Sequence, residues 1–325
     1  MRVIHNPCTD PAFNLAAEEW LLRHTDTDMF MLWRNAKAVI VGRNQNTLSE
    51  INEDHVRAHD IPVVRRLTGG GAVFHDPGNL NFTFISLRRS GNGLDFRKFA
   101  APVIAALNAM GVPCAFNGRN DIVAGGKKIS GNAQHIAGDR VLHHGTLLFA
   151  ANIADISAAL RPNAAKFTGK AVRSVRSRVG NIADFLPRPM SIEEFAAALL
   201  WQVTGGATPA EQGFRPEETE GIATLAAAKY RTWEWNYGHS PRYDMARVTR
   251  TPGGLIDARL NVRNGLITEA RLYGDYFGVR DVAGLEMALC GCRHERAALA
   301  DRLATLPLAE YMQGVDAATL AACLA

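Results

Sequence analysis

The first hydrophobic pattern along the chain is a run of apolar residues at helical spacing. This spacing predicts a helix over residues 11–24. Leu15 and Leu22 fall on one side of that helix, and the neighbouring carboxylates Glu18 and Glu19 fall on another. The pattern therefore predicts an amphipathic helix.

The following segments mix strands and helices without strict alternation. Residues 29–33 and 38–41 are apolar runs separated by polar residues, which predicts two strands paired around a turn. Apolar spacing then predicts helices over 49–59, 97–110 and 191–204, and strands over 81–86 and between 113 and 150. Clustered strands with helices between them predict an α+β fold, a mixed sheet flanked by helices.

The pattern restarts near the end of the chain. A further helix is predicted up to about Tyr230, and an aromatic cluster at 233–237 follows it. Alternating strands at 247–249, 258–262 and 270–273 then lead into closing helices. We therefore expect two domains, residues 1–243 and a small α+β accessory domain at 244–325.

Composition excludes several classes of protein. Of the 325 residues, 47% are hydrophobic and 21% charged, which is ordinary for a globular protein. We expect a cytoplasmic protein, because no signal peptide or membrane-spanning run is visible. The five scattered cysteines predict reduced thiols. A net charge of +4, with a basic run at 173–178 that lacks interleaved aromatics, does not indicate nucleic acid.

The most informative segment for chemistry runs from Arg65 to Asp76 and contains three consecutive glycines. Glycines that leave a strand allow positive φ angles and let backbone N–H groups converge on an anion. Arg65 and Arg66 precede them, and each carries a planar charged fork suited to phosphate or carboxylate. The segment alone fits an anion-binding loop or a tight turn.

Two common nucleotide motifs do not fit this chain. Residues 125–130 are not a P-loop, because they lack the spaced upstream glycine and a Ser or Thr directly after the first lysine. Residues 69–74 do not complete the dinucleotide-binding pattern of three spaced glycines. Any nucleotide site must therefore be of another type.

A second segment places a lysine opposite two polar residues. Asn120 and Asp121 lie on a predicted strand, and the returning strand brings Lys128 back towards them. An ammonium group held between an acyl carboxylate and an α-phosphate would stabilise charge in the transition state. Lys128 is therefore the candidate electrophile, although Lys127 and Lys128 alone would also fit a solvated hairpin tip.

The segment Arg66–Asp76, with Gly78 and Asn79 after it, resembles the adenylate-binding signature of lipoate-protein ligases. Other segments resemble the same family, in the family's order: 118–122, 128–131, 143–148, 174–178 and 233–235. Thr68 stands where the family commonly has serine, and both residues present a hydroxyl. The resemblance implies a catalytic domain of the biotin/lipoate ligase type followed by the accessory domain of two-domain ligases.

The resemblance also implies roles for individual residues. The nucleotide would be held by Arg66, Thr68, Gly70, Gly71, Ala72, Val73 and Phe74, and the adenylate pocket would be lined by Asn79, Asn120, Asp121 and Thr146. Lys128 would contact both the lipoyl carbonyl and the phosphate as the catalytic residue. Trp33, Gly71 and His144 would lie near the lipoyl chain.

The implied reaction uses ATP, Mg²⁺ and lipoic acid. ATP activates lipoate as lipoyl-AMP, and the lipoyl group passes to a lysine of a carrier domain, in an E2 subunit of a 2-oxoacid dehydrogenase or in the glycine cleavage H protein. Asp121 is the carboxylate expected to approach Mg²⁺ through ATP. We expect a monomer that binds neither nucleic acid nor membrane.

Three alternatives remain at this stage. An ATP-independent octanoyl or lipoyl transferase needs an activated cysteine near the acyl site. No cysteine lies between Lys128 and residue 289, and Cys114 is expected to be a packed thiol in a strand. A biotin ligase would carry a Gly-Arg-Gly-Arg run, which is missing here. A non-catalytic lipoate-binding protein would not need Lys128 beside the glycines.

Overall fold

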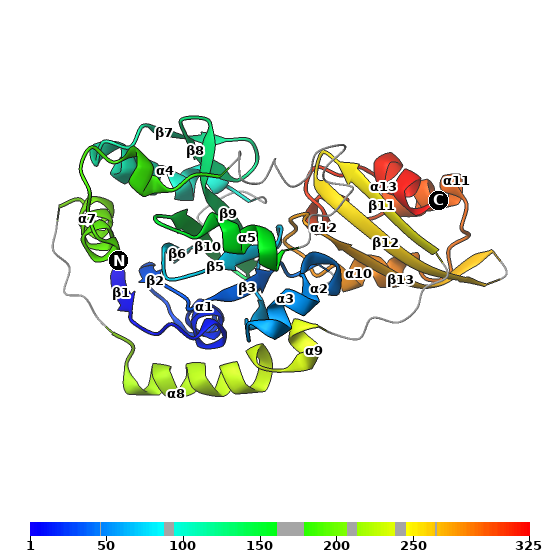
Figure 1. Cartoon of the computed structure of the whole chain (residues 1–325). Helices are drawn as coiled ribbons and strands as arrows, with labels where there is room; N and C mark the ends of the chain where they lie inside the picture. The colour runs from blue at the N-terminus through cyan, green and yellow to red at the C-terminus, as the bar shows by residue number, and fades with distance from the viewer. Residues whose placement is uncertain (46, 88–93, 161–178, 207–212, 238–244, 264) are drawn as a thin grey trace.

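A mixed seven-stranded sheet forms the centre of the larger part of the molecule (Figure 1). The computed structural model describes residues 1–45, 47–87, 94–160, 179–206, 213–237, 245–263 and 265–325. In spatial order the strands are β1 (Arg2–Asn6), β2 (Met29–Trp33), β6 (Asn79–Leu87), β10 (Arg140–Leu148), β9 (Lys127–Ala137), β8 (Asp121–Ala124) and β7 (Cys114–Asn117). β1 and β2 are parallel and the other neighbours are antiparallel, so the predicted mixed sheet is confirmed.

Helices cover both faces of this sheet. On one face lie α4 (Phe96–Ala109) and α7 (Ile192–Val203), whose apolar sides share a core with Phe30, Phe82 and Phe84 of the sheet. Both helices match their predictions and begin at side-chain caps, Asp95 and Ser191. On the other face lie α1 (Pro11–His24), α8 (Pro216–Leu225) and the π-helix η3 (Ala226–Tyr230).

Helix α1 has the predicted ends but not the predicted faces. Asp10 caps its start by accepting a hydrogen bond from the backbone N–H of Ala12, and Pro11 occupies the first turn. The predicted amphipathic character is wrong, because the side with the two acidic residues is also buried, and Glu18 and Glu19 are only 3% and 1% exposed. The helix lies between the sheet and the α8–η3 segment, so almost every side of it is covered.

A second, smaller sheet packs against the face that carries α1. Its order is β4 (Val63–Arg65), β3 (Ala38–Val41) and β5 (Val73–His75). The expected pairing of residues 29–33 with 38–41 is therefore wrong, since these runs belong to different sheets. Asn35, in the connection, is fully buried and bonded to Asn14 and His75, so this segment crosses between layers instead of turning back.

Short helices complete the larger part of the chain. The helix predicted over 49–59 is divided into α2 (Thr47–Glu50) and α3 (Glu53–Ala58), because Asn52 caps the second piece. The remaining elements are α5 (Ile153–Ala159), the 3₁₀ helix η2 (Ile182–Phe185) and α9 (Trp233–Asn236). The 174–178 segment and the predicted boundary near residue 243 lie outside the described residues.

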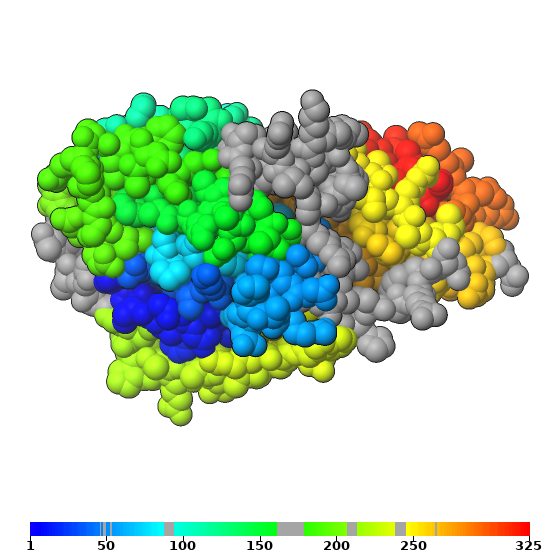
Figure 2. All heavy atoms as spheres, in the orientation of Figure 1, coloured from blue at the N-terminus to red at the C-terminus, as the bar shows by residue number. Residues whose placement is uncertain are grey.

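The C-terminal part has its own sheet and its own core. Strands β11 (Met245–Thr251), β12 (Gly254–Arg263) and β13 (Leu266–Gly274) form an antiparallel sheet. Helices α10 (Ala283–Leu289), α11 (Arg296–Ala304), α12 (Leu308–Tyr311) and α13 (Ala317–Leu324) share its apolar core. Figure 2 shows this part, from yellow to red, as a lobe beside the larger one.

The two lobes meet next to the glycine segment. Phe277 of the C-terminal lobe packs with Phe96 and Ala133, and its ring lies beside Gly70. The Arg119 guanidinium lies 4.6 Å from the centroid of that ring and donates to the carbonyl of Asp275. A second link joins Arg43 and Asp281, 2.7 Å apart. In the described part of the chain, no helix is long and apolar enough to span a bilayer.

Candidate active site

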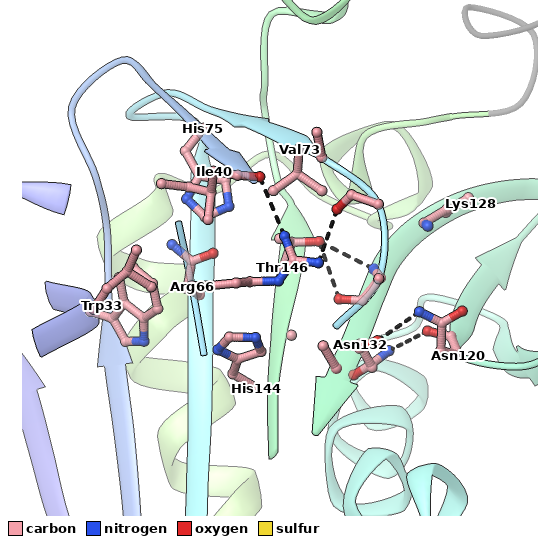
Figure 3. A pocket seen from close by; sticks show the side chains of 18 residues that line it. Trp33, Ile40, Arg66, Val73, His75, Asn120, Lys128, Asn132, His144 and Thr146 are labelled. Carbon is pink, nitrogen blue, oxygen red and sulfur yellow. Dashed lines mark hydrogen bonds between the residues drawn. The ribbon is translucent and has the colours of Figure 1, made fainter. Parts of the chain in front are cut away.

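A cavity of about 130 Å³ lies between the seven-stranded sheet and the glycine segment (Figure 3). Strand register builds its floor. Asn81 of β6 is paired with Trp33 on one side and with Thr146 on the other, so these three side chains form a row across the sheet. His144 lies two residues from Thr146 on the same face of β10, as strand alternation requires. The floor is therefore aromatic at one end and polar at the other.

The opposite wall is the glycine loop, residues 69–72, which Arg66 holds in shape. The Arg66 guanidinium donates to the carbonyls of Gly69 (2.6 Å), Gly71 (2.9 Å) and Ile40 (3.3 Å), and its Nε donates to Thr68 (2.9 Å). Gly70 has a φ of +94°, a conformation that glycine adopts without strain. Four of the five N–H donors of Arg66 are thus used to fold the loop.

Lys128, labelled in Figure 3, lines the same cavity as the glycine loop. A β-bulge lies beside it, because Val123 pairs with Lys128 whereas Ile122 pairs with Ser130. The extra residue shifts the alternation of β9 by one, so that Lys128 comes to the same face as Gly131. Its ammonium group lies 2.7 Å from the Asp121 carboxylate, and both side chains are about one-third exposed (36%).

Most of the predicted site residues line this one cavity. They are Trp33, Arg66, Gly70, Gly71, Ala72, Val73, Asn120, Lys128, His144 and Thr146. Four others lie behind its wall. Thr68 is fully buried and hydrogen-bonded to Arg66, and Asn79 is fully buried and hydrogen-bonded to Asn81. Phe74 belongs to a separate apolar cluster. Asp121 pairs with Lys128.

Arg65 does not take the anion-binding position expected for both arginines. Its side chain donates six hydrogen bonds to groups in the 42–47 segment and in α9. The direction follows from strand alternation, because consecutive residues at the end of β4 point to opposite sides. Burial lowers the pKa of both guanidinium groups to about 10, so both remain cationic at neutral pH.

Sequence reasoning missed three polar residues of the cavity, His75, Asn81 and Asn132. The Nδ2 of Asn35 donates to the Nδ1 of His75, since the Oδ1 of Asn35 already accepts from Asn14. Burial, with a smaller effect of the Arg66 charge, lowers the pKa of His75 to about 3, so His75 is neutral and carries its proton on Nε2. Among the described residues, the Nε2 of His75 and the Nδ2 of Asn81 have no hydrogen-bond partner, so both can serve a ligand.

Two buried histidines, His75 and His143, and the partly buried His135 predict an acid-sensitive fold. Burial lowers the pKa of His75 to about 3, that of His135 to about 4 and that of His143 well below its usual value. In the unfolded chain these groups bind a proton near pH 6.5. Protonation therefore favours the unfolded state as pH falls below 6.5, at about 1.4 kcal/mol per pH unit for each histidine.

Urea denaturation at pH 7.5 and at pH 5.5 measures this effect. We expect a clearly lower free energy of unfolding at pH 5.5. His135→Gln should remove the contribution of one of the three histidines. The difference in the free energy of unfolding between the two pH values should then be smaller. Equal stability of the wild-type protein at both pH values would contradict the assignment.

The cysteines do not form a nucleophilic site. Cys114 begins β7 as expected, and burial raises the pKa of its thiol to about 11. It therefore carries almost no thiolate at neutral pH. All five cysteines are free thiols. Cys290, which follows α10, is exposed.

Comparison with known proteins places this arrangement in a class of enzymes. Residues 10–204 match the model of the lipoyl protein ligase A/B catalytic domain, and residues 240–324 match that of the bacterial lipoate protein ligase C-terminus. A curated relative, lipoate–protein ligase 1 of Staphylococcus aureus, is 41% identical over 316 residues, which cover 97% of this chain and 96% of the relative. The chain belongs to the family of ATP-dependent lipoate-protein ligases.

Solved structures agree with this assignment. The lipoate complex of LipL1 from P. falciparum matches with a TM-score of 0.80 at 24% identity, over 94% of each chain, which concerns the fold. A lipoate-protein ligase A bound with ATP matches with a TM-score of 0.63 at 29% identity, over 73% of this chain and 98% of that one. A bipartite ligase of Thermoplasma acidophilum, described with its E2 lipoyl domain, matches with a TM-score of 0.65 at 29% identity. The match covers 75% of this chain and 100% of that one.

Proposed function

We propose that the cavity catalyses two successive transfers, an adenylyl transfer to lipoate and then an acyl transfer to a lysine. The lipoate carboxylate attacks the α-phosphorus of ATP, and pyrophosphate leaves. The amine of a carrier lysine then attacks the carbonyl of the mixed anhydride, and AMP leaves as the amide forms. The observation that supports this proposal is the position of Lys128 and the glycine loop on opposite walls of one small cavity.

The two ends of the cavity suit the two ends of an acyl adenylate. Trp33 and Ile40 provide an apolar surface for the lipoyl chain, and Thr146, Asn120 and the glycine loop provide polar groups near Lys128. We assign the lipoyl chain to the Trp33 end and the phosphate to the end between Lys128 and Arg66. Because these groups are held before any ligand binds, the enzyme supplies orientation and charge stabilisation without a covalent intermediate.

The pairing of Lys128 with Asp121 fits this role. The carboxylate holds the ammonium group at the rim of the cavity and shares its charge. When lipoate and ATP bind, a carboxylate and a phosphate compete for the same ammonium. We propose that Lys128 then bridges the two reacting groups, which are both anionic and would otherwise repel each other.

The described residues do not form a magnesium site of their own. No three histidine, cysteine, aspartate or glutamate side chains gather as metal ligands in the described part of the chain, and Asp121 faces a lysine. Asp121 is paired with Lys128 in this structure, and its approach to Mg²⁺ through ATP stays a prediction. We assign no step to the metal.

The acceptor that we propose is a lysine on a lipoyl carrier domain, in an E2 subunit or in the glycine cleavage H protein. The Thermoplasma ligase, described together with an E2 lipoyl domain, supports the first of these. We also propose that residues 1–243 carry both transfers and that residues 244–325 act as the accessory domain.

Two assays test the proposed function. Lipoate should promote exchange of labelled pyrophosphate into ATP, and mass spectrometry of a lipoyl domain should then show one lipoyl group added on its lysine. The second reaction should need ATP. A mass increase from an acyl-carrier donor without ATP would instead indicate a transferase and would contradict the proposal.

A further inference from the structure

Glu18 is a buried carboxylate of α1, on the same face of the sheet as the cavity, and two chains of hydrogen bonds end on it. The first chain comes from the glycine loop. Arg66 donates through Nε to Thr68 (2.9 Å), the hydroxyl of Thr68 lies 2.8 Å from Nε2 of His144, and Nδ1 of that ring lies 2.9 Å from both oxygens of Glu18. All four residues are more than nine-tenths buried.

The second chain comes from the apolar end of the cavity. The indole Nε1 of Trp33 donates to the hydroxyl of Thr83 (2.9 Å), and that hydroxyl donates to Oε1 of Glu18 (2.6 Å). Trp33 and Thr83 are 2% and 1% exposed. One carboxylate thus terminates hydrogen bonds from the wall that we assign to the acyl chain and from the loop that we assign to the phosphate.

The end groups limit the direction of these bonds, because an arginine Nε and an indole N–H can only donate. Thr83 accepts from Trp33 and donates to Glu18. Thr68 accepts from Arg66, and the first chain is complete when its hydroxyl donates to Nε2 of His144 and Nδ1 of His144 donates to Glu18. We call these six residues (Arg66, Thr68, His144, Glu18, Thr83 and Trp33) the Glu18 network.

We propose that Glu18 is a positioning residue that organises both halves of the cavity before substrates bind. It fixes the tautomer of His144 and, through Thr68, the guanidinium that shapes the glycine loop. It also fixes the ring of Trp33 through Thr83. Oε1 accepts from Thr83, and both oxygens lie 2.9 Å from Nδ1 of His144, so an amide NH₂ in place of either oxygen would face a donor.

This inference depends on the proposed assignment of the two cavity ends. It predicts that variants of one chain change lipoate binding and variants of the other chain change ATP binding. Thr83→Val cuts only the chain to Trp33, and it should weaken lipoate binding about tenfold while ATP binding stays within about twofold. Thr68→Val cuts only the chain to Arg66, and it should weaken ATP binding about tenfold with little effect on lipoate. Glu18→Gln should weaken the binding of both ligands.

Isothermal titration calorimetry with lipoate alone and with ATP alone measures these dissociation constants without any catalytic step. A double-mutant cycle adds a second readout. If Glu18 terminates the chain from Trp33, then Thr83→Val should cost little more lipoate affinity in the Glu18→Gln background. A purely structural carboxylate would show additive losses.

Glu19→Gln is the matched control. Glu19 is the next residue of α1, is equally buried, and binds Lys229 (2.8 Å) and Tyr230 (2.6 Å) outside the Glu18 network. Its loss should lower thermal stability without changing either dissociation constant. Glu18→Gln with both constants unchanged, or with changes no larger than those of Glu19→Gln, would overturn the proposal.

If Glu18→Gln does not fold, the two threonine variants decide the matter. Equal effects of Thr83→Val and Thr68→Val on both ligands would contradict two separate chains. Failure of the proposed function would look different. In that case the wild-type protein would show no lipoate-dependent pyrophosphate exchange, whereas failure of the inference leaves exchange intact and the selective binding changes missing.

Discussion

Lys128→Ala should reduce lipoate-dependent pyrophosphate exchange by about a hundred- to a thousand-fold, the usual loss when one preorganised charge-stabilising donor is removed. The ammonium group is the cation that faces the glycine loop from β9, and a β-bulge brings it to that face. Its side chain is 36% exposed, so its removal should cost little folding free energy. Thermal unfolding of the variant should therefore stay close to that of the wild type.

Lys127→Ala is the matched control for this prediction. Lys127 is the preceding residue of β9, is exposed, and packs its stem near Gly180, away from the cavity. It carries the same charge into the same strand. Its variant should keep nearly full exchange activity. Similar losses from the two lysines would show that the net positive charge of the hairpin matters and not the position of Lys128.

The sequence predicted the elements that depend on local patterns. Helices α1, α4 and α7 lie within one or two residues of the predicted ranges, because capping side chains and apolar spacing are both local. The pairing of strands was less accessible. Residues 29–33 and 38–41 are strands as expected, but a buried asparagine between them sends the chain into a second sheet, and this effect depends on contacts with Asn14 and His75.

In the candidate site, too, local motifs were predictable from the sequence and long-range contacts were not. The glycine loop, Arg66 and Lys128 were recognisable because each belongs to a continuous motif, and the structure places them around one cavity. The burial of Glu18 could not be predicted, since helical periodicity cannot tell that a second layer covers that side of α1. Arg65 and Arg66 are both arginines, and the sequence alone does not show which one reaches the glycine loop. The alternation of side chains at the end of β4 determines this. The bulge that turns Lys128 inward leaves no clear trace in the sequence.

The neighbouring arginines should give opposite signatures when each is replaced by lysine. Lysine keeps the charge but cannot donate to several carbonyl groups in a plane. Arg65 bonds to the carbonyls of Gly42, Arg43 and Gln45 and to two groups in α9, all remote from the floor of the cavity. Arg65→Lys leaves several of these buried carbonyls without a donor, and it should lower the free energy of unfolding by about 3 kcal/mol or more.

Arg66→Lys acts on the loop that faces Lys128. Without a fork that joins the carbonyls of Gly69 and Gly71, the backbone N–H groups of this loop lose their shared orientation. We therefore expect about a hundred-fold loss in kcat/KM for ATP in pyrophosphate exchange. The loss of stability should be smaller than for Arg65→Lys, because fewer carbonyl groups lose their donor.

Urea denaturation and exchange kinetics on both variants measure the two effects separately. The comparison is internally matched, since the variants differ by one position and carry the same charge. The ratio of lost activity to lost stability should be much higher for Arg66→Lys. Equal ratios would mean that the loop and the 42–47 segment unfold as one unit, and that Arg66 contributes to catalysis only by keeping the protein folded.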